Sequence, residues 1–259
     1  MKIPDRGKPP RRRAGTRGVL LACLGCGMAA QAMAADHGTW DALLRQYVDD
    51  EGRVAYRRLE AESGPTLSQY LTTLAGATPG ALPPKEQLAF WINAYNATIV
   101  AGVLQRYSAE NALKRVFFFK SYNRRIAAVD RTPNDIEHGI IRRQFREPRI
   151  HFALVCAATS CPPLRREAYV GERLDDQLDD QARRFLNDPT RNRIDVGSGQ
   201  VVLSPIFKWF AEDFAAAGGP LADVLQPYLS AEQRRLLEAA KIRYQEYDWR
   251  LNAQPGQRP

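Results

Sequence analysis

Several features that would mark this chain as a member of a large class of proteins are missing from it. No stretch after the N-terminal region approaches the ~20 uninterrupted apolar residues that a membrane-spanning helix needs. There is no glycine-rich phosphate loop and no regular alternation of strands and helices, which favours an α+β fold over a parallel α/β fold. Neither an HExxH motif nor a pair of CxxC motifs is present. A metal site built from Glu137, His138, His151 and Cys161 therefore has little support, and no cofactor is predicted.

The first 34 residues have the pattern of a secretory signal peptide. Seven basic residues precede a short apolar run at 19–30, and Ala32-Met33-Ala34 is an A-x-A cleavage site. We therefore expect a mature chain of residues 35–259 that is periplasmic or secreted. A competing interpretation is a lipoprotein anchor at Cys23, but Leu20-Leu21-Ala22 leaves almost no apolar region before that cysteine.

Most of the positive charge of the chain lies in this leader. The leader holds seven of the 37 Lys and Arg residues and one of the 29 Asp and Glu residues, so the mature chain has a net charge of about +2. Because no basic stripe interleaved with aromatic residues remains, we predict no nucleic-acid partner. Cys23 and Cys26 leave with the leader, and Cys156 and Cys161 remain in an oxidising compartment.

Residues 35–259 contain no repeat and no Gly/Ser-rich linker, which predicts a single globular domain. The expected fold is helix-rich α+β with a small, mainly antiparallel sheet. Apolar periodicity predicts helices at 40–48, 66–74, 84–107, 133–145, 172–186, 206–217, 220–229 and 231–240. Short β-branched or apolar runs predict strands at 116–119, 125–129, 150–157, 193–196 and 200–203, with a further strand within 241–249.

The long helix at 84–107 carries two asparagines inside its apolar stripe, Asn93 and Asn96. A buried amide needs partners, because an unpaired buried polar group costs on the order of 1–3 kcal/mol. Two interpretations follow and neither is excluded by the sequence. The asparagines bond the backbone of a neighbouring loop, or they belong to a binding site.

The helix at 133–145 begins with a clear start signal, since Thr132 is a natural N-cap and Pro133 suits the first helical position. Glu137 projects into its buried face and needs a cationic or N–H partner, while His138 lies at the edge of that face. The run at 150–157 then reads as a strand buried on both faces. His151 opens this run, and Cys161 follows on a turn.

Five separated motifs resemble one family: FWINAYNATI at 90–99, IEHGII at 136–141, IHFALVCAATSCPPL at 150–164, IFKWFAEDF at 206–214 and YDWRLN at 247–252. Together they are similar to the domain of unknown function 547 family over about residues 66–252. The resemblance implies no reaction, because the family has none assigned. It does imply that the family pattern is built from Asn93, Asn96, Glu137, His138, His151, Cys161 and Asp248.

The first functional hypothesis is a cysteine-dependent hydrolase or acyltransferase. Cys161 would be the nucleophile, activated by His138 or His151, with Glu137, Asn93 or Asn96 orienting the imidazole. Ten residues of extended chain would separate His151 from Cys161, which favours His138 as the base. A papain-like or transglutaminase-like architecture fits by analogy, although no cysteine begins the long helix, where papain-like enzymes place theirs.

The alternative hypothesis is a non-enzymatic envelope protein. Cys156 and Cys161 would form a structural disulfide, and a thiol mechanism would then fail unless the bridge itself were redox-active. The ligand would be peptide-like or a glycan, bound in a groove lined by Trp91, Tyr95, Phe207 and Trp209, with Asn93, Asn96 and Asp248 as further binding residues. The sequence does not specify an oligomeric state.

Overall fold

The computed structural model describes residues 35–107 and 111–259. The predicted signal peptide and the lipoprotein alternative at Cys23 lie outside the described residues. The described chain opens with helices α1 (Gly38–Tyr47) and α2 (Tyr56–Ala75), followed by the short helix η1 (Pro79–Ala81). No helix in this described part of the chain has the length and apolarity needed to cross a membrane.

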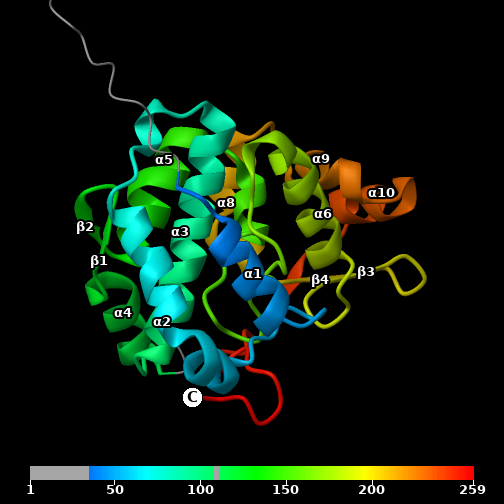
Figure 1. The fold of residues 1–259 in the computed structure, drawn as a ribbon. Coiled ribbons are helices and arrows are strands. Elements are labelled where there is room, and N and C mark those ends of the chain that lie inside the picture. Colours follow the sequence, from blue (N-terminus) through cyan, green and yellow to red (C-terminus); the bar gives the residue numbers. More distant parts are fainter. Residues whose placement is uncertain (1–34, 108–110) are drawn as a thin grey trace, which may run out of the picture. The chain divides into compact units, whose positions relative to one another are not determined.

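Helix α3 (Pro84–Leu104) is the long helix that the sequence predicts, and it begins with proline at its first position. Every residue from Leu88 to Val103 is buried. The helix therefore has no solvent-facing side over this length, in contrast to the one apolar stripe expected, and such all-round burial is typical of a central core helix. It contacts α2 on one side, as Figure 1 shows, and η2, η4 and α6 on others.

Helix α4 (Ala112–Ser121) occupies the segment 116–119, so the strand predicted there is wrong. The side chain of Asn111 accepts hydrogen bonds from the backbone N–H groups of Leu113 and Lys114 and so caps this helix. A short run of valine and phenylalanine does not distinguish a strand from a helix by itself. The cap, which satisfies N–H groups that a helix start leaves unpaired, favours the helix here.

Strands β1 (Arg124–Ile126) and β2 (Val129–Arg131) form an antiparallel hairpin in place of the single strand expected at 125–129. Its turn residues Ala127 and Ala128 have φ values of 50° and 61°, a left-handed conformation that is unfavourable for alanine. Their N–H groups bond the carbonyls of Leu74 and Ala75 at the end of α2. The turn thus supplies donors to carbonyls that the helix end would leave unpaired.

The predicted helix after Thr132 is present and contains the wide turns of η2 (Asp135–Ile141) before α5 (Arg142–Phe145). The Thr132 hydroxyl accepts from the Asp135 N–H at 3.1 Å, and the Asp135 carboxylate accepts from the Thr132 N–H at 2.9 Å. The predicted cap is therefore confirmed, and a reciprocal partner strengthens it.

Removal of this cap should weaken the helix that carries Glu137 and His138. We expect Thr132→Ala to lower the free energy of unfolding by about 1 kcal/mol, the usual cost of losing a threonine cap. Thr132→Ser retains the hydroxyl and serves as the matched control. Urea unfolding followed by circular dichroism measures both variants, and equal losses in the two would contradict the capping role.

The strand predicted at 150–157 is also wrong. Residues Pro148–Phe152 form the short helix η3, and the chain beyond it is irregular. The Glu147 side chain caps η3 by accepting from the Arg149 N–H at 3.0 Å. Continuous apolar residues reveal that this segment is buried, but not which backbone conformation it adopts.

The rest of the chain holds η4 (Gly171–Arg173), α6 (Leu174–Leu186), α7 (Ile206–Trp209), α8 (Ala211–Ala216), α9 (Leu221–Leu225), η5 (Gln226–Tyr228) and α10 (Ala231–Ala239). Strands β3 (Arg193–Asp195) and β4 (Gln200–Leu203) form the predicted hairpin, and β5 (Arg243–Tyr244) pairs with β4 in parallel. The helix-rich α+β fold is thus confirmed, with one antiparallel sheet and one small mixed sheet.

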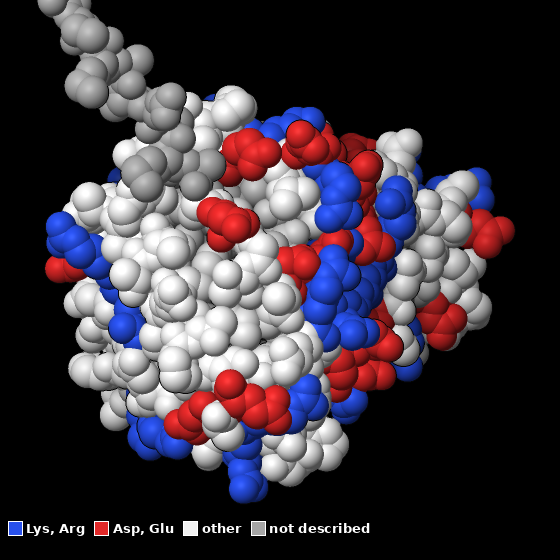
Figure 2. Space-filling view, viewed as in Figure 1, with Lys and Arg blue, Asp and Glu red and all other residues white. Residues whose placement is uncertain are grey.

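Charged side chains gather along α6 next to α1, where Figure 2 shows basic and acidic groups interleaved in a band. Ion pairs also join different elements, such as Arg149 with Asp179 at 2.8 Å and Arg166 with Asp50 at 2.5 Å. Figure 2 thus shows charges of both signs side by side on this face.

The start of the described chain contains a titratable group that links stability to pH. His37 is largely buried against Tyr70 and Phe90, and its Nδ1 lies 2.7 Å from the Tyr70 hydroxyl. Burial lowers the pKa of His37 from 6.5 to about 4, although Asp36 opposes this shift. The folded state therefore holds a neutral imidazole that the unfolded chain protonates below pH 6.5.

The pKa of His37 is lower in the folded state than in the unfolded state. The contribution of neutral His37 to the free energy of unfolding is therefore complete above pH 6.5 and is lost as pH falls toward 4. We expect a loss of about 2 kcal/mol over that interval. The His37→Gln variant should lose correspondingly less between pH 6.5 and 4.5, a range chosen to limit carboxylate titration. Urea midpoints at each pH measure this, and parallel curves for the two proteins would rule it out.

Candidate functional site

A cavity of about 290 Å³ brings most of the predicted site residues together. Glu137 and His138 from η2, His151 from η3 and both cysteines line it, with Tyr95 from α3. Trp209 from α7 and Tyr247 and Trp249 from the C-terminal segment complete the wall. Trp209 is 49% exposed, so the cavity has a solvent-facing side.

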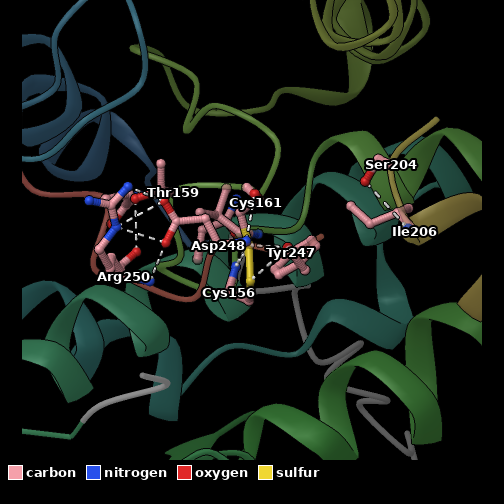
Figure 3. The surroundings of a disulfide bond; sticks show 12 residues. Cys156, Thr159, Cys161, Ser204, Ile206, Tyr247, Asp248 and Arg250 are labelled. Carbon is pink, nitrogen blue, oxygen red and sulfur yellow. Dashed lines mark hydrogen bonds and ion pairs between the residues drawn. A yellow bond between two sulfur atoms is a disulfide. The ribbon is translucent and has the colours of Figure 1, made fainter. Parts of the chain in front are cut away.

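The two cysteines of the described chain form a disulfide, with Cα atoms 6.1 Å apart. The Tyr247 hydroxyl lies 3.3 Å from the Cys156 Sγ and 3.2 Å from the Cys161 Sγ, as Figure 3 shows. The Cys156 N–H also donates to the Cys161 Sγ at 2.9 Å. Cys161 therefore has no free thiol in this state, and the prediction that it is a ready nucleophile does not hold for the oxidised protein.

The C-terminal segment holds the loop that carries Cys161. The N–H groups of Thr159 and Ser160 donate to the carbonyls of Arg250 and Asp248, at 2.7 and 3.1 Å. The Ser160 hydroxyl accepts from the Asp248 N–H at 2.9 Å, and the Asp248 carboxylate accepts from Arg250 (Figure 3). Asp248, predicted as a binding residue, thus positions the loop through its backbone and lies outside the cavity lining.

His151, which lines the cavity, forms a short polar contact with Asp213. Its Nε2 lies 2.7 Å from a carboxylate oxygen of Asp213, and its ring stacks on Phe210 at 3.9 Å. Arg142 donates to both oxygens of the same carboxylate, at 2.5 and 2.9 Å. Although burial opposes the shift, these hydrogen bonds hold the pKa of Asp213 well below its usual range.

The protonation of His151 follows from the chemistry of its partner. An ionised carboxylate only accepts hydrogen bonds, so the proton of neutral His151 is on Nε2. The Nδ1 lone pair is then available to take a proton. Asp213 and His151 thus have the relation in which a carboxylate orients a catalytic base.

His138 has the same tautomer as His151, but its unprotonated nitrogen already has a partner. Arg142 lies 2.8 Å from the His138 Nδ1, and because a guanidinium only donates, this nitrogen must accept. The Nε2 of neutral His138 therefore carries the proton, 4.0 Å from the Glu137 carboxylate. His138 can donate a hydrogen bond at the cavity, but it does not present a basic nitrogen there. The expectation that His138 is the better base is not supported by this geometry.

Glu137 has the buried partner that the sequence required, although the partner is a phenol instead of a cation. The Tyr95 hydroxyl donates to the Glu137 carboxylate at 3.0 Å, and the Glu137 side chain is 13% exposed. The carboxylate also raises the pKa of Tyr95, in addition to the larger effect of burial.

Asn93 and Asn96 bond loop backbone, which was the structural interpretation left open by the sequence. The Asn93 amide donates to the Tyr169 carbonyl at 2.8 Å and accepts from its N–H at 2.9 Å. The Asn96 amide does the same with the Ala153 carbonyl and the Val155 N–H, both at 3.0 Å. Neither residue lines the cavity, and both anchor loops to α3.

The aromatic groove predicted from the sequence is only half correct. Tyr95 and Trp209 line the cavity, whereas Trp91 and Phe207 are buried in the core. The aromatic wall is completed by Tyr247 and Trp249, which the groove prediction did not include. Their ring centroids lie 4.5 Å apart, and that of Tyr247 lies 4.8 Å from Trp209.

Sequence reasoning missed Asp213, Arg142 and Tyr247. Asp213 lies 62 residues from His151, and Tyr247 lies 86 residues from Cys161. One signal was available, since Asp213 belongs to IFKWFAEDF and Tyr247 to YDWRLN, two of the motifs quoted above. Within the part of the chain that the structure describes, no group of three or more His, Cys, Asp or Glu side chains is arranged to hold a metal ion.

The fold and the cavity together define a helix-rich α+β protein with a disulfide, a histidine–aspartate pair and an aromatic wall around one cavity. Residues 79–186 match the family model described as "Protein of unknown function, DUF547". The resemblance is thus confirmed for a segment that includes Glu137, His138, His151 and both cysteines. Comparisons with curated proteins and with solved structures found no match.

Proposed function

We propose that this protein is an exported, cysteine-dependent hydrolase or acyltransferase that acts in its dithiol form. The observation that carries the proposal is that His151, which pairs with Asp213, lines one cavity together with both sulfur-bearing residues. A cysteine nucleophile needs a base, and the base needs a third group that holds its tautomer. His151 and Asp213 have this relation, and the cysteines line the same cavity as His151.

Of the two cysteines, Cys156 is the better nucleophile. Cys161 is 2% exposed, whereas Cys156 is partly exposed and lies on the cavity side. A nucleophile must reach the substrate, so the role moves from Cys161, which the sequence suggested, to Cys156. In the oxidised protein, Cys161 then holds Cys156 in a disulfide.

The acyl-transfer steps follow from these roles. The Nδ1 of His151 takes the proton of the Cys156 thiol, and the imidazolium formed faces the Asp213 carboxylate. The thiolate attacks the acyl carbon, a thioester forms, and the leaving group departs with the proton from His151. Water or another acceptor then releases the acyl group. The Nε2–H of His138 and the hydroxyl of Tyr247 are donors at the cavity for the oxyanion.

The wall of Trp209, Tyr247 and Trp249 supports a substrate with a flat or apolar group, such as a peptide-like side chain or a sugar ring. The same wall supports a second candidate, a non-enzymatic binding protein with a structural disulfide. One variant distinguishes the two candidate functions. Cys156→Ser would abolish turnover in the first and leave ligand affinity intact in the second.

The test uses protein reduced with a dithiol and then freed of it. We expect p-nitrophenyl esters to release nitrophenol in a burst, with mass spectrometry showing an acyl group on Cys156. The burst should vanish in Cys156→Ser and persist in Cys161→Ser, which is the matched control. A burst that persists without Cys156, or an acyl group on Cys161, would overturn the assignment.

Export is part of the proposal. It rests on the leader pattern of residues 1–34 and on the disulfide, which is typical of oxidising compartments. Fractionation of producing cells and N-terminal sequencing should find a periplasmic or secreted chain that begins at Ala35. A chain that retains residues 1–34 in the cytosol would contradict it, and a lipid-modified Cys23 would indicate the anchored alternative.

A further inference from the structure

We propose that the Cys156–Cys161 bridge is a redox-active disulfide that exchanges with a small thiol. In this exchange the thiol attacks Cys156, and Cys161 leaves as the thiolate. The exchange stands by itself, and only its consequence, the activation of Cys156 for acyl transfer, rests on the proposed function.

Access to the two sulfur-bearing residues differs. Cys156 is partly exposed on the wall of the 290 Å³ cavity, whereas Cys161 is 2% exposed. An attacking thiolate must approach a disulfide sulfur directly, so access decides which sulfur is attacked. The cavity therefore directs attack to Cys156.

The environment of Cys161 favours its departure. The Cys161 Sγ accepts hydrogen bonds from the Cys156 N–H and from the Tyr247 hydroxyl. Burial raises the pKa of Tyr247, so its hydroxyl stays protonated and remains a donor. Hydrogen bonds to a thiolate stabilise it, and a better-stabilised leaving thiolate departs faster.

Charged groups at the cavity favour an anionic partner. Arg115 and Lys120 from α4 line it together with Glu137 and His138, and the Glu137 carboxylate accepts from Tyr95. A thiolate that carries its own carboxylates, as a small peptide thiol does, is attracted to the two cations. We therefore assign the partner to this chemical class.

The exchange is balanced by a second thiol. The first thiolate forms a mixed disulfide with Cys156 as the Cys156–Cys161 bond breaks, and Cys161 keeps the electron pair. A second thiolate then attacks the sulfur of the small thiol in the mixed disulfide, and Cys156 leaves as a thiolate. The protein gains two electrons and, on protonation, two protons, while two small thiols are oxidised to their disulfide.

The loop does not depend on the disulfide for its position. Backbone bonds from Thr159 and Ser160 reach the C-terminal segment, and Arg191 donates to the carbonyls of Cys161 and Thr159 at 2.8 and 2.9 Å. None of these contacts involves a sulfur, so none of them requires the sulfur–sulfur bond. Reduction is therefore expected in the folded protein.

The test treats the folded, oxidised protein with glutathione, quenches with N-ethylmaleimide at early times and maps the modified peptide by mass spectrometry. We expect glutathione on Cys156 and maleimide on Cys161, with near-UV circular dichroism retained. Glutathione on Cys161, or reduction that occurs only together with unfolding, would overturn the proposal.

Tyr247→Phe should slow the exchange about tenfold, because it removes one hydrogen bond to a charged sulfur. Tyr228→Phe is the matched control, since the Tyr228 hydroxyl bonds Asp179 away from the cavity. Equal rates for Tyr247→Phe and the control would show that Tyr247 has no part in the exchange.

Exchange without ester turnover by the dithiol form would leave this proposal standing and refute the hydrolase. Ester turnover after chemical reduction, with no thiol exchange in the folded protein, would refute the exchange and leave the hydrolase standing.

Discussion

Asn93→Ala will lower the free energy of unfolding by about 3–5 kcal/mol, a large part of the total for a domain of ordinary stability. The substitution leaves both the carbonyl and the N–H of Tyr169 without the amide that now pairs them. Each buried backbone group that loses its partner costs about 1–3 kcal/mol. Asn93 itself is fully buried, so water does not replace the lost bonds without structural change.

Thr98→Ala is the matched control, because Thr98 is equally buried on the same helix but its hydroxyl bonds only the Ala94 carbonyl of that helix. We expect it to cost about 1 kcal/mol, the net value of an ordinary hydrogen bond. Urea unfolding at neutral pH measures both variants. An Asn93→Ala protein no less stable than Thr98→Ala would show that the Tyr169 loop does not need its anchor.

Asp213→Asn will reduce the acylation rate of the reduced protein about 10³- to 10⁴-fold if His151 is the base, the usual cost of losing the carboxylate that orients a catalytic histidine. The neutral amide presents an N–H₂ group as well as an oxygen, so it no longer requires the proton of His151 to be on Nε2. It also removes the charge that faces the imidazolium during the reaction and that pairs with Arg142.

The measurement is the p-nitrophenyl ester burst as a function of pH, because an orienting role predicts a changed pH profile as well as a lower rate. Asp223→Asn is the control, since Asp223 pairs with Arg234 and neither residue lines the cavity. Circular dichroism verifies that both variants are folded. A burst in Asp213→Asn within threefold of the control would remove Asp213 and His151 from the mechanism.

The helices were predictable where the sequence carries local signals. The start of α3 at Pro84 and the start after Thr132 follow from proline and cap positions, which act within a few residues. The β3–β4 hairpin follows in the same way from the glycines between its strands. In these places the chain's own neighbours decide the backbone, so no tertiary contact was needed to predict it.

Two segments show where local signals fail. The runs at 116–119 and 150–157 are apolar and short, and both were predicted as strands, but one is helical and the other is mostly irregular. For the second run, the Asn96 amide on α3 pairs with Ala153 and Val155 as a neighbouring strand would. A side chain 57 residues away in sequence thus satisfies the backbone, which no local pattern reveals.

The sequence by itself determined the helix-rich α+β class, the resemblance to the DUF547 family and several of the residues that line the cavity, because these depend on periodicity, caps and motif spacing. Only the tertiary structure decided what those residues do. It joined Cys156 to Cys161, placed Asp213 on His151 and Tyr247 on the sulfurs, and placed Arg142 on the Nδ1 of His138. The physical reason is that a proton's position and a sulfur's reactivity depend on atoms within about 3 Å. Those atoms come from segments far apart in the chain.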